Sequence, residues 1–147
     1  MVTFPGGEWD VYRPTSAQNV IDFHGRTGYA RTAIEARAPI VPVVSIGTQE
    51  NQLYLSRGTW LAKQPGLRRL GSEILPISFG FPFGFSVVVP INLPLPTKIV
   101  TQVLEPFDVV AAIGADADIA SVDAHVRSVM QDALDELTSR RRFPVLG

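Results

Sequence analysis

The sequence has no cysteine and little charge. Without cysteine, disulfide scaffolds, zinc–thiolate sites and thiol nucleophiles are excluded. Only 18% of the 147 residues are charged, whereas an average soluble domain has about 25%. Lys and Arg number 13 against 14 Asp and Glu, so the chain lacks the basic excess of a nucleic-acid-binding surface. We therefore expect no nucleic-acid partner.

The common catalytic and phosphate-binding motifs are also missing. The sequence contains no G-x-S-x-G elbow, no G-x-x-x-x-G-K-[ST] loop and no G-x-G-x-x-G turn. Its two histidines are His24 and His125, and apart from Asp123 neither has a partner at metal-ligand spacing. We expect no metal site and interpret His125 as a surface residue.

Apolar residues dominate instead, at 46% of the chain. The longest stretch without charge, residues 74–97, is 24 residues long and contains five prolines. That many prolines would break the hydrogen bonds of a membrane-spanning helix. We interpret residues 74–97 as apolar loops and short strands that are buried or lie at a membrane surface.

The hydrophobic pattern predicts helices at residues 25–38 and 118–138, where apolar residues recur at helical spacing. Residues 53–55 and 97–104 have strand composition. Residues 40–46 form a continuous apolar run, which is typical of a strand buried on both faces. A helix followed by such a strand is half of a βαβ unit, so the pattern favours a parallel sheet.

We therefore predict an α/β fold with part of a mixed or parallel sheet flanked by helices, ending in a long amphipathic helix. Residues 1–110 are expected to form the α/β domain, and residues 111–147 the helix packed on it. Residues 1–4 are interpreted as the end of a strand, stopped by Pro5-Gly6-Gly7. Because a domain seldom starts at a strand end, we expect further sequence upstream.

Two stretches together resemble a known family. The first is F-P-G-G-E-W-D at residues 4–10. The second is G-R-T-G-Y-A-R-T-A at residues 25–33, followed by A-P-I-V-P-V-V-S-I-G at 38–47. In this order they resemble the third block (F-P-E-G, or Y-P-G-G-x-x-E) and the fourth block of the glycerolipid acyltransferases, which include lysophosphatidate and diacylglycerol acyltransferases. The resemblance covers most of residues 4–108, and implies an incomplete acyltransferase-like domain.

The resemblance also implies substrate-binding roles. The acceptor-alcohol site would lie at Gly6, Gly7, Glu8 and Asp10. Asp10 stands where the diacylglycerol branch has glutamate, which keeps the charge. Arg13 would contact an anion or headgroup, and Pro39 and Pro42 would shape the wall beside the acyl chain.

The catalytic block of the family is H-x-x-x-x-D, and this chain has none. In the family, the histidine is the general base on the acceptor hydroxyl and lies before the third block. Here both histidines follow that block, and the residues five positions after them are Tyr29 and Met130. We assign no catalytic residue and expect the C-terminal portion of an acyltransferase, truncated and inactive alone.

The function implied is the acceptor- and acyl-binding half of an acyl-CoA-dependent O-acyltransferase of phospholipid biosynthesis. Its partners would be a glycerolipid or lysophospholipid acceptor, acyl-CoA as donor and a membrane surface. No bound cofactor is expected. The protein would lie peripherally on the cytoplasmic side of a membrane.

Two alternatives stay open. A non-catalytic, membrane-associated lipid-binding module is suggested by an aromatic group and a basic group close in sequence. The aromatic residues are Trp60, Phe79, Phe81, Phe83 and Phe85, and the basic ones are Arg57, Lys63, Arg68 and Arg69. A soluble α/β enzyme of another class would use Glu8, Asp10 and His24.

Overall fold

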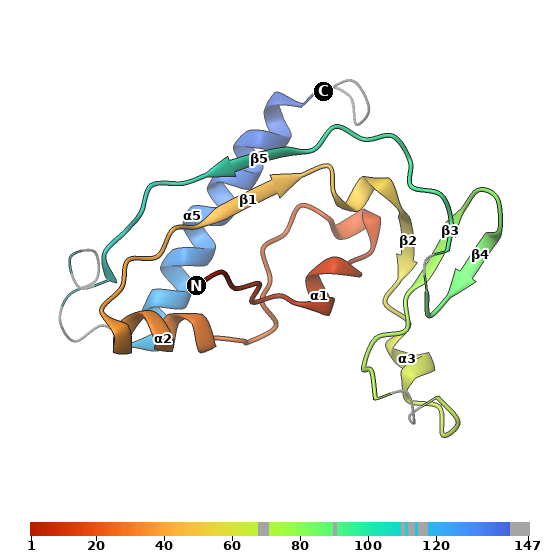
Figure 1. Cartoon of the computed structure of the whole chain (residues 1–147), viewed down its shortest axis with the longest axis horizontal. Coiled ribbons are helices and arrows are strands. Elements are labelled where there is room, and N and C mark those ends of the chain that lie inside the picture. The colour runs from red at the N-terminus through yellow and green to blue at the C-terminus, as the bar shows by residue number, and fades with distance from the viewer. Residues whose placement is uncertain (68–70, 90, 110, 112–113, 115–117, 142–147) are drawn as a thin grey trace. The chain divides into compact units, whose positions relative to one another are not determined.

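The computed structural model describes residues 1–67, 71–89, 91–109, 111, 114 and 118–141 (Figure 1). The chain forms two compact units, each assembled from separate segments. The helical unit takes its described residues from 1–7, 19–46 and 99–141. The hairpin unit takes its described residues from 8–18 and 47–98. Arg68 and Arg69, part of the predicted basic group, lie outside the described residues.

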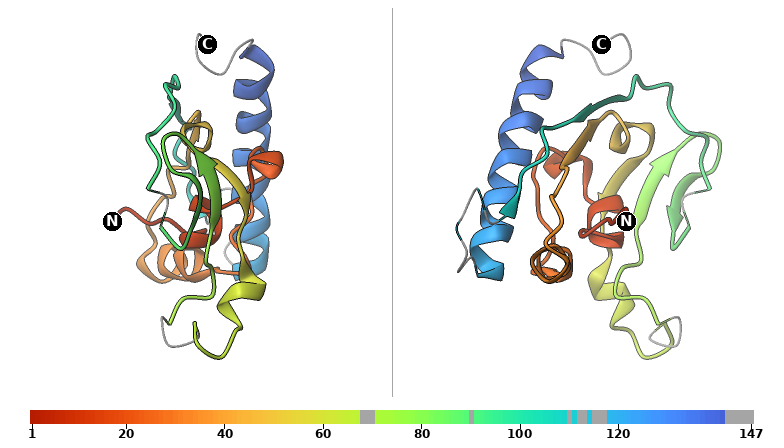
Figure 2. Two further views of the ribbon diagram at one scale, coloured as in Figure 1. Left: turned by 90° about the vertical axis from the view of Figure 1, so that its right-hand side faces the viewer. Right: turned by 60° about the vertical axis from the view of Figure 1, so that its left-hand side comes forward.

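The helical unit pairs two strands beside two helices. Strand β1 (Val43–Ile46) and strand β5 (Val100–Val103) are antiparallel. Helix α5 (Ile119–Arg140) runs alongside these strands, and helix α2 (Gly28–Ala36) lies near the N-terminal end of α5 (Figure 2). The fold of this unit is therefore a two-stranded antiparallel sheet packed on a long helix.

The core of the helical unit forms where α2 meets α5. Ala30 and Ala33 lie one turn apart on α2, and Val122 and Val126 lie one turn apart on α5. All four are buried, together with Phe23, whose ring packs edge-on against Tyr29 with centroids 5.5 Å apart. The alanines let the two helices approach closely, because they present no bulky side chain to α5.

Both predicted helices and the predicted strand at 97–104 are confirmed, as α2, α5 and β5. The predicted mixed or parallel sheet is not what the described strands form, because every ladder between them is antiparallel. Strand β1 is not buried on both faces either: Val44 and Ile46 are buried, whereas Val43 and Ser45 are exposed. Residues 1–4 do not end a strand; they have no regular structure.

The hairpin unit is built on three short strands. Strands β2 (Leu53–Ser56), β3 (Ile77–Gly80) and β4 (Gly84–Val87) form an antiparallel sheet in the order β2-β3-β4. Residues 8–19 contain helix α1 (Glu8–Val11) and a 3-10 turn at Thr15–Ala17. A second 3-10 turn, Gln49–Asn51, precedes β2 and the short helix α3 (Thr59–Ala62) follows it.

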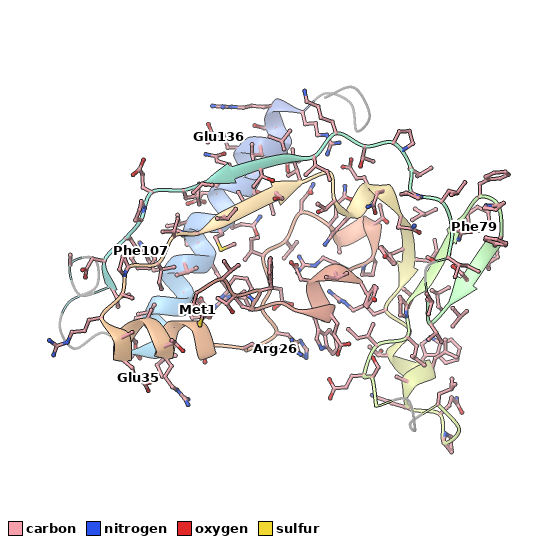
Figure 3. All side chains as sticks on the ribbon, viewed as in Figure 1. Met1, Arg26, Glu35, Phe79, Phe107 and Glu136 are labelled. Atoms are coloured by element: carbon pink, nitrogen blue, oxygen red, sulfur yellow. The ribbon has the colours of Figure 1, made fainter. Side chains whose placement is uncertain are left out.

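The interpretation of residues 74–97 as short strands and loops is confirmed by β3 and β4. Within the part of the chain that the structure describes, no helix is both long and apolar enough to cross a bilayer. Aromatic side chains of this segment, Phe79 among them, are drawn at the hairpin in Figure 3.

Candidate functional site

A pocket of about 1040 Å³ opens in the hairpin unit. Three stretches of the chain line it: residues 9–14, which include part of α1, residues 56–63, which include the end of β2 and α3, and residues 71–73. The lining residues are Trp9, Pro14, Ser56, Arg57, Thr59, Ala62, Lys63, Gly71, Ser72 and Glu73. The walls combine an indole and aliphatic groups with two cations, one carboxylate and several hydroxyls.

Arg57 fixes one side of the pocket. Its Nε and Nη2 donate hydrogen bonds of 3.2 and 3.0 Å to the carbonyl oxygen of Trp9. Its guanidinium carbon also lies 5.4 Å from the centre of the Trp9 ring, within the range of a cation–π contact. The bonds join α1 to the residue that follows β2, so the indole and guanidinium form a single wall. Lys63 lies at the C-terminal end of α3 and is exposed.

Ser72 links the pocket to Glu8, one of the residues predicted at the acceptor site. The Ser72 hydroxyl lies 3.3 Å from Oε2 of Glu8 and 2.8 Å from the carbonyl oxygen of Ile74. It also accepts a 3.2 Å hydrogen bond from the backbone N–H of Ile74. Because a hydroxyl has a single proton, Ser72 donates to only one of its two acceptors at a time. Since Ser72 lines the pocket, the Glu8 carboxylate lies at the border of the pocket.

Arg13 and Asp10 form an ion pair in the same unit. Nη2 of Arg13 lies 2.8 Å from Oδ1 of Asp10. Arg13 is buried at 2% exposure, whereas the Asp10 side chain is 53% exposed. A buried guanidinium requires such a partner, because burying an isolated charge is costly. The structure thus places the predicted anion-contacting residue in a structural pair next to Pro14, which lines the pocket.

Gly6 and Gly7 lie in the helical unit, where they meet Arg26. The N–H of Gly7 donates a 3.1 Å hydrogen bond to the carbonyl oxygen of Phe4 and closes a turn. Nη1 of Arg26 donates a 3.5 Å hydrogen bond to the carbonyl oxygen of Gly6. A Cβ on Gly7, which has φ of +52°, would lie 2.5 Å from that Nη1. The two stretches that carry the family resemblance are therefore in contact at this turn.

Pro39 and Pro42 lie at the start of the β1–β5 pairing in the helical unit. Pro39 is exposed and Pro42 is buried. The carbonyl oxygen of Pro42 accepts a 2.9 Å hydrogen bond from the N–H of Leu104, and Ile40 and Phe107 form an isolated bridge. This accounts for a proline before β1, because its missing N–H falls outside the strand and its carbonyl is still used.

The structure thus groups the seven predicted residues in two sets. Glu8, Asp10 and Arg13 belong to the hairpin unit, near or beside the pocket. The other four belong to the helical unit: Gly6, Gly7, Pro39 and Pro42. Sequence reasoning missed Trp9, Ser72 and the pocket itself. The sequence does contain one signal, the group of basic residues that includes Arg57 and Lys63. By itself this group indicates only a membrane-facing surface.

The histidines lie outside this pocket. His24 is exposed and has φ of +53°, and its backbone N–H donates to Oδ1 of Asp22. His125 is exposed on α5, with its ring edge-on to Phe107 at a centroid distance of 5.0 Å. Among the described residues, no group of three or more His, Asp and Glu side chains is arranged to hold a metal ion.

The chain matches no protein-family model, no curated protein and no solved structure.

Proposed function

We propose that this chain binds the acceptor and acyl substrates of an acyl-CoA-dependent O-acyltransferase that acts on glycerolipid alcohols. The observation that carries the proposal is the pocket of the hairpin unit. It places the cations of Arg57 and Lys63 beside an indole and aliphatic wall, next to the Glu8 carboxylate. Cations beside apolar surface suit an amphiphile with an anionic head, such as a lysophospholipid.

Each wall of the pocket has a role in this proposal. The exposed ammonium of Lys63 receives the phosphate of the acceptor, since charge-assisted hydrogen bonds are the strong ones. The Trp9 ring and Ala62 contact the hydrocarbon next to the head. Ser72 and Glu8 form hydrogen bonds with the free hydroxyl of the acceptor. The carboxylate of Glu73 disfavours a second anionic group in the same pocket.

The contact of Arg26 with Gly6 supports the same proposal. It brings together the two stretches whose order resembles the acyltransferase blocks, so the resemblance is matched by proximity in space. In the helical unit, the segment with Pro39 and Pro42 would shape the wall beside the acyl chain. A peripheral location on the cytoplasmic side of a membrane would suit such substrates.

The chemistry needs a base, and the histidine motif that supplies it in the acyltransferases that the sequence resembles is missing from this sequence. In O-acyl transfer, the acceptor oxygen attacks the thioester carbonyl, its proton passes to a base, the C–S bond breaks and CoA leaves as the thiol. The chain contains no H-x-x-x-x-D. We therefore propose substrate binding without turnover by this chain alone.

Binding can be followed with Trp9, which lines the pocket. The chain has two tryptophans, so a Trp60→Phe variant leaves Trp9 as the only fluorescent reporter of this kind. We expect a saturable change in Trp9 emission on titration with a short-chain lysophosphatidate below its micelle concentration. In this background, Lys63→Gln should weaken binding roughly tenfold, as expected for one charge-assisted contact.

Two controls define the site. Lys98→Gln removes a lysine of the same unit that does not line the pocket, and should leave the affinity unchanged. A monoacylglycerol without phosphate should bind equally well to the Lys63→Gln variant and its parent. Absence of saturable binding, or equal losses from the two lysine variants, would contradict the proposal.

A further inference from the structure

The three-stranded sheet of the hairpin unit is inverted relative to an ordinary soluble sheet. Tyr54, Ser78 and Ser86 are paired across the strands and face inward, where all three are buried. On the opposite side the apolar face, which we define as Leu53, Phe79, Phe85 and Val87, is exposed. Successive residues of a strand point to opposite sides, so the assignment applies along β3 and β4, whereas the pairing of β2 with β3 is irregular between Tyr54 and Ser56.

The inward side of the sheet, which we call the polar face and define as Tyr54, Ser78 and Ser86, is held in place by hydrogen bonds. The Ser78 and Ser86 hydroxyls are 2.7 Å apart, and Nδ2 of Asn92 donates to the carbonyl oxygen of Gly84 at 2.9 Å. Nε2 of Gln52 donates to the carbonyl oxygen of Asn92 at 2.9 Å. A slip of one residue in the pairing would exchange the two faces and break these bonds. The exposure of the apolar face is therefore fixed by the register.

The chain covers the polar face and leaves the apolar face open. Asn92 is buried against Gly80, where an added Cβ would lie 2.9 Å from the Cβ of Asn92. The N–H of Leu95 donates a 2.7 Å hydrogen bond to the carbonyl oxygen of Asn51, which fastens this covering segment. The unit thus uses its own residues to bury serine and asparagine, while phenylalanine stays in contact with solvent.

The tip of the hairpin extends the apolar face. Phe81 is 75% exposed and Phe83 is 63% exposed. On the apolar face itself, the rings of Phe79 and Phe85 pack edge to face with their centroids 5.0 Å apart. An apolar patch of this kind marks a binding surface, because soluble monomers seldom expose one.

The chemistry of the surface selects a lipid occupant over a protein. Protein interfaces have a polar rim and hydrogen bonds across them, whereas residues 74–97 contain no charged side chain. Addition of a strand from a second copy is disfavoured near the tip and in the following segment, because Pro82, Pro94 and Pro96 have no N–H to donate. Phe and Leu are among the side chains that interfacial elements bury at the boundary between water and lipid.

The charge of the unit selects the type of lipid. By sequence, residues 8–18 and 47–98 of this unit contain six Lys and Arg against four Asp and Glu, and the six include Arg68 and Arg69, which lie outside the described residues. The helical unit has the opposite balance, with seven against ten. Basic residues are attracted to anionic headgroups, and salt weakens this attraction. The hairpin unit is therefore the part of the chain whose charge complements an anionic leaflet.

From these observations we infer that the apolar face docks the hairpin unit on an anionic lipid bilayer, with Phe81 and Phe83 inserted among the lipids. This surface is separate from the residues that line the pocket. The inference goes beyond the proposed function and does not rest on it, since docking needs no ligand in the pocket.

Co-sedimentation of the full chain with vesicles tests the inference. We expect binding to vesicles of phosphatidylcholine and phosphatidylglycerol, stronger than to phosphatidylcholine alone, and weakened by added salt. Phe81→Ser with Phe83→Ser should lower the partition coefficient roughly tenfold or more, since two exposed rings lose their contact with lipid. These side chains are exposed, so circular dichroism should show an unchanged fold.

The matched control is Phe4→Ser with Val103→Ser, which removes two exposed apolar residues from the helical unit. It should leave the partition coefficient unchanged. In a Phe83→Trp variant that also has Trp60→Phe, the emission should shift to shorter wavelength when vesicles are added, and by more than in the Trp60→Phe parent, which has only Trp9. Equal binding by both double variants, no binding to anionic vesicles, or a discrete dimer without lipid that the tip variants dissociate would overturn the inference.

Discussion

At the scale of single residues, Gly58 shows how closely the hairpin unit is packed. It lies between β2 and α3 with φ of +59°, a conformation that glycine adopts without strain. A Cβ at this position would lie 2.0 Å from the carbonyl oxygen of Leu75, which is a backbone atom of a residue only 2% exposed. The backbone at Leu75 cannot move away from such a Cβ without displacing the segment that leads into β3.

We therefore expect Gly58→Ala to lower the free energy of unfolding by at least about 2 kcal/mol, through strain at positive φ and the backbone clash. Urea denaturation followed by circular dichroism measures the loss. Gly66→Ala is the matched control, because nothing lies within 4 Å of its added Cβ, and it should change stability by less than about 0.5 kcal/mol. Similar effects of the two substitutions would contradict the close approach at Gly58.

At the scale of elements, a polar contact connects α2 to α5. The phenol of Tyr29 donates a 2.8 Å hydrogen bond to Oδ1 of Asp123, whose Oδ2 lies 2.8 Å from Nε of Arg127. Burial raises the pKa of Tyr29, and the hydrogen bond to Asp123 and the charge of that carboxylate raise it further. Arg127 acts in the opposite direction. The contact therefore favours a neutral phenol in the folded state.

Removal of the phenol hydroxyl should have two effects. Tyr29→Phe is expected to lower stability by about 1 kcal/mol at neutral pH, because Asp123 loses a hydrogen bond. A raised pKa in the folded state means that the unfolded chain ionises first, so stability falls as pH rises above 10.0, the ordinary value for tyrosine. Urea midpoints at neutral and alkaline pH should show a smaller alkaline loss in Tyr29→Phe than in the native chain. An identical alkaline loss would contradict this account.

At the start of α5, the cap residue Asp118 makes the stability of the fold depend on pH in the acid range. Oδ1 of Asp118 accepts a 2.8 Å hydrogen bond from the N–H of Ser121, and this bond lowers the pKa of Asp118 from its ordinary 3.8. The stabilisation is complete above pH 3.8 and is lost as pH falls through the lowered pKa. Asp118→Ala should thus reduce the Tm at neutral pH, and the difference should shrink on acidification. Asp118→Asn is the control, because asparagine can still accept the capping hydrogen bond, and its Tm at neutral pH should fall less than that of Asp118→Ala.

The helices were predictable because their information is local. Ala30, Ala33, Val122 and Val126 recur at helical spacing, and the positions themselves define the buried stripe. The partner of β1 was not predictable in this way. Nothing in residues 43–46 indicates pairing with Val100–Val103, which follows after the whole β2–β3–β4 sheet.

In the candidate site too, residues close in sequence were predictable, whereas contacts between distant segments were not. Glu8 and Arg13 could be singled out from a motif, because they are close in sequence. The pocket could not, because Trp9, Arg57 and Ser72 come together only through the fold. The inverted sheet was also hidden: alternation in 77–80 and 84–87 shows which residues share a face, but not that serine faces inward and phenylalanine outward.

At the scale of the whole molecule, the proposed substrate-binding groups occur in a sequence that has no H-x-x-x-x-D, the block that supplies the histidine base in the family it resembles. We therefore expect no release of CoA above the uncatalysed rate when the chain is incubated with acyl-CoA and a lysophospholipid. A thiol reagent gives a clean measurement, because the chain has no cysteine of its own. Turnover that disappears in a His24→Ala variant would show instead that the chain is a complete catalyst.

The alternation of the β2–β3–β4 sheet has a practical consequence for work with this protein. Ser78 and Ser86 share a hydrogen bond on the inner side of the β3–β4 pairing. Phe79 and Phe85 occupy the neighbouring positions and are exposed on the opposite side. Hydrophilic replacements at Leu53, Phe79, Phe85 and Val87 should therefore raise the solubility of the chain for crystallisation and keep the native pairing. Replacements at Ser78 and Ser86 would instead leave solubility unchanged and remove the hydrogen bond that helps to set the register of β3 and β4.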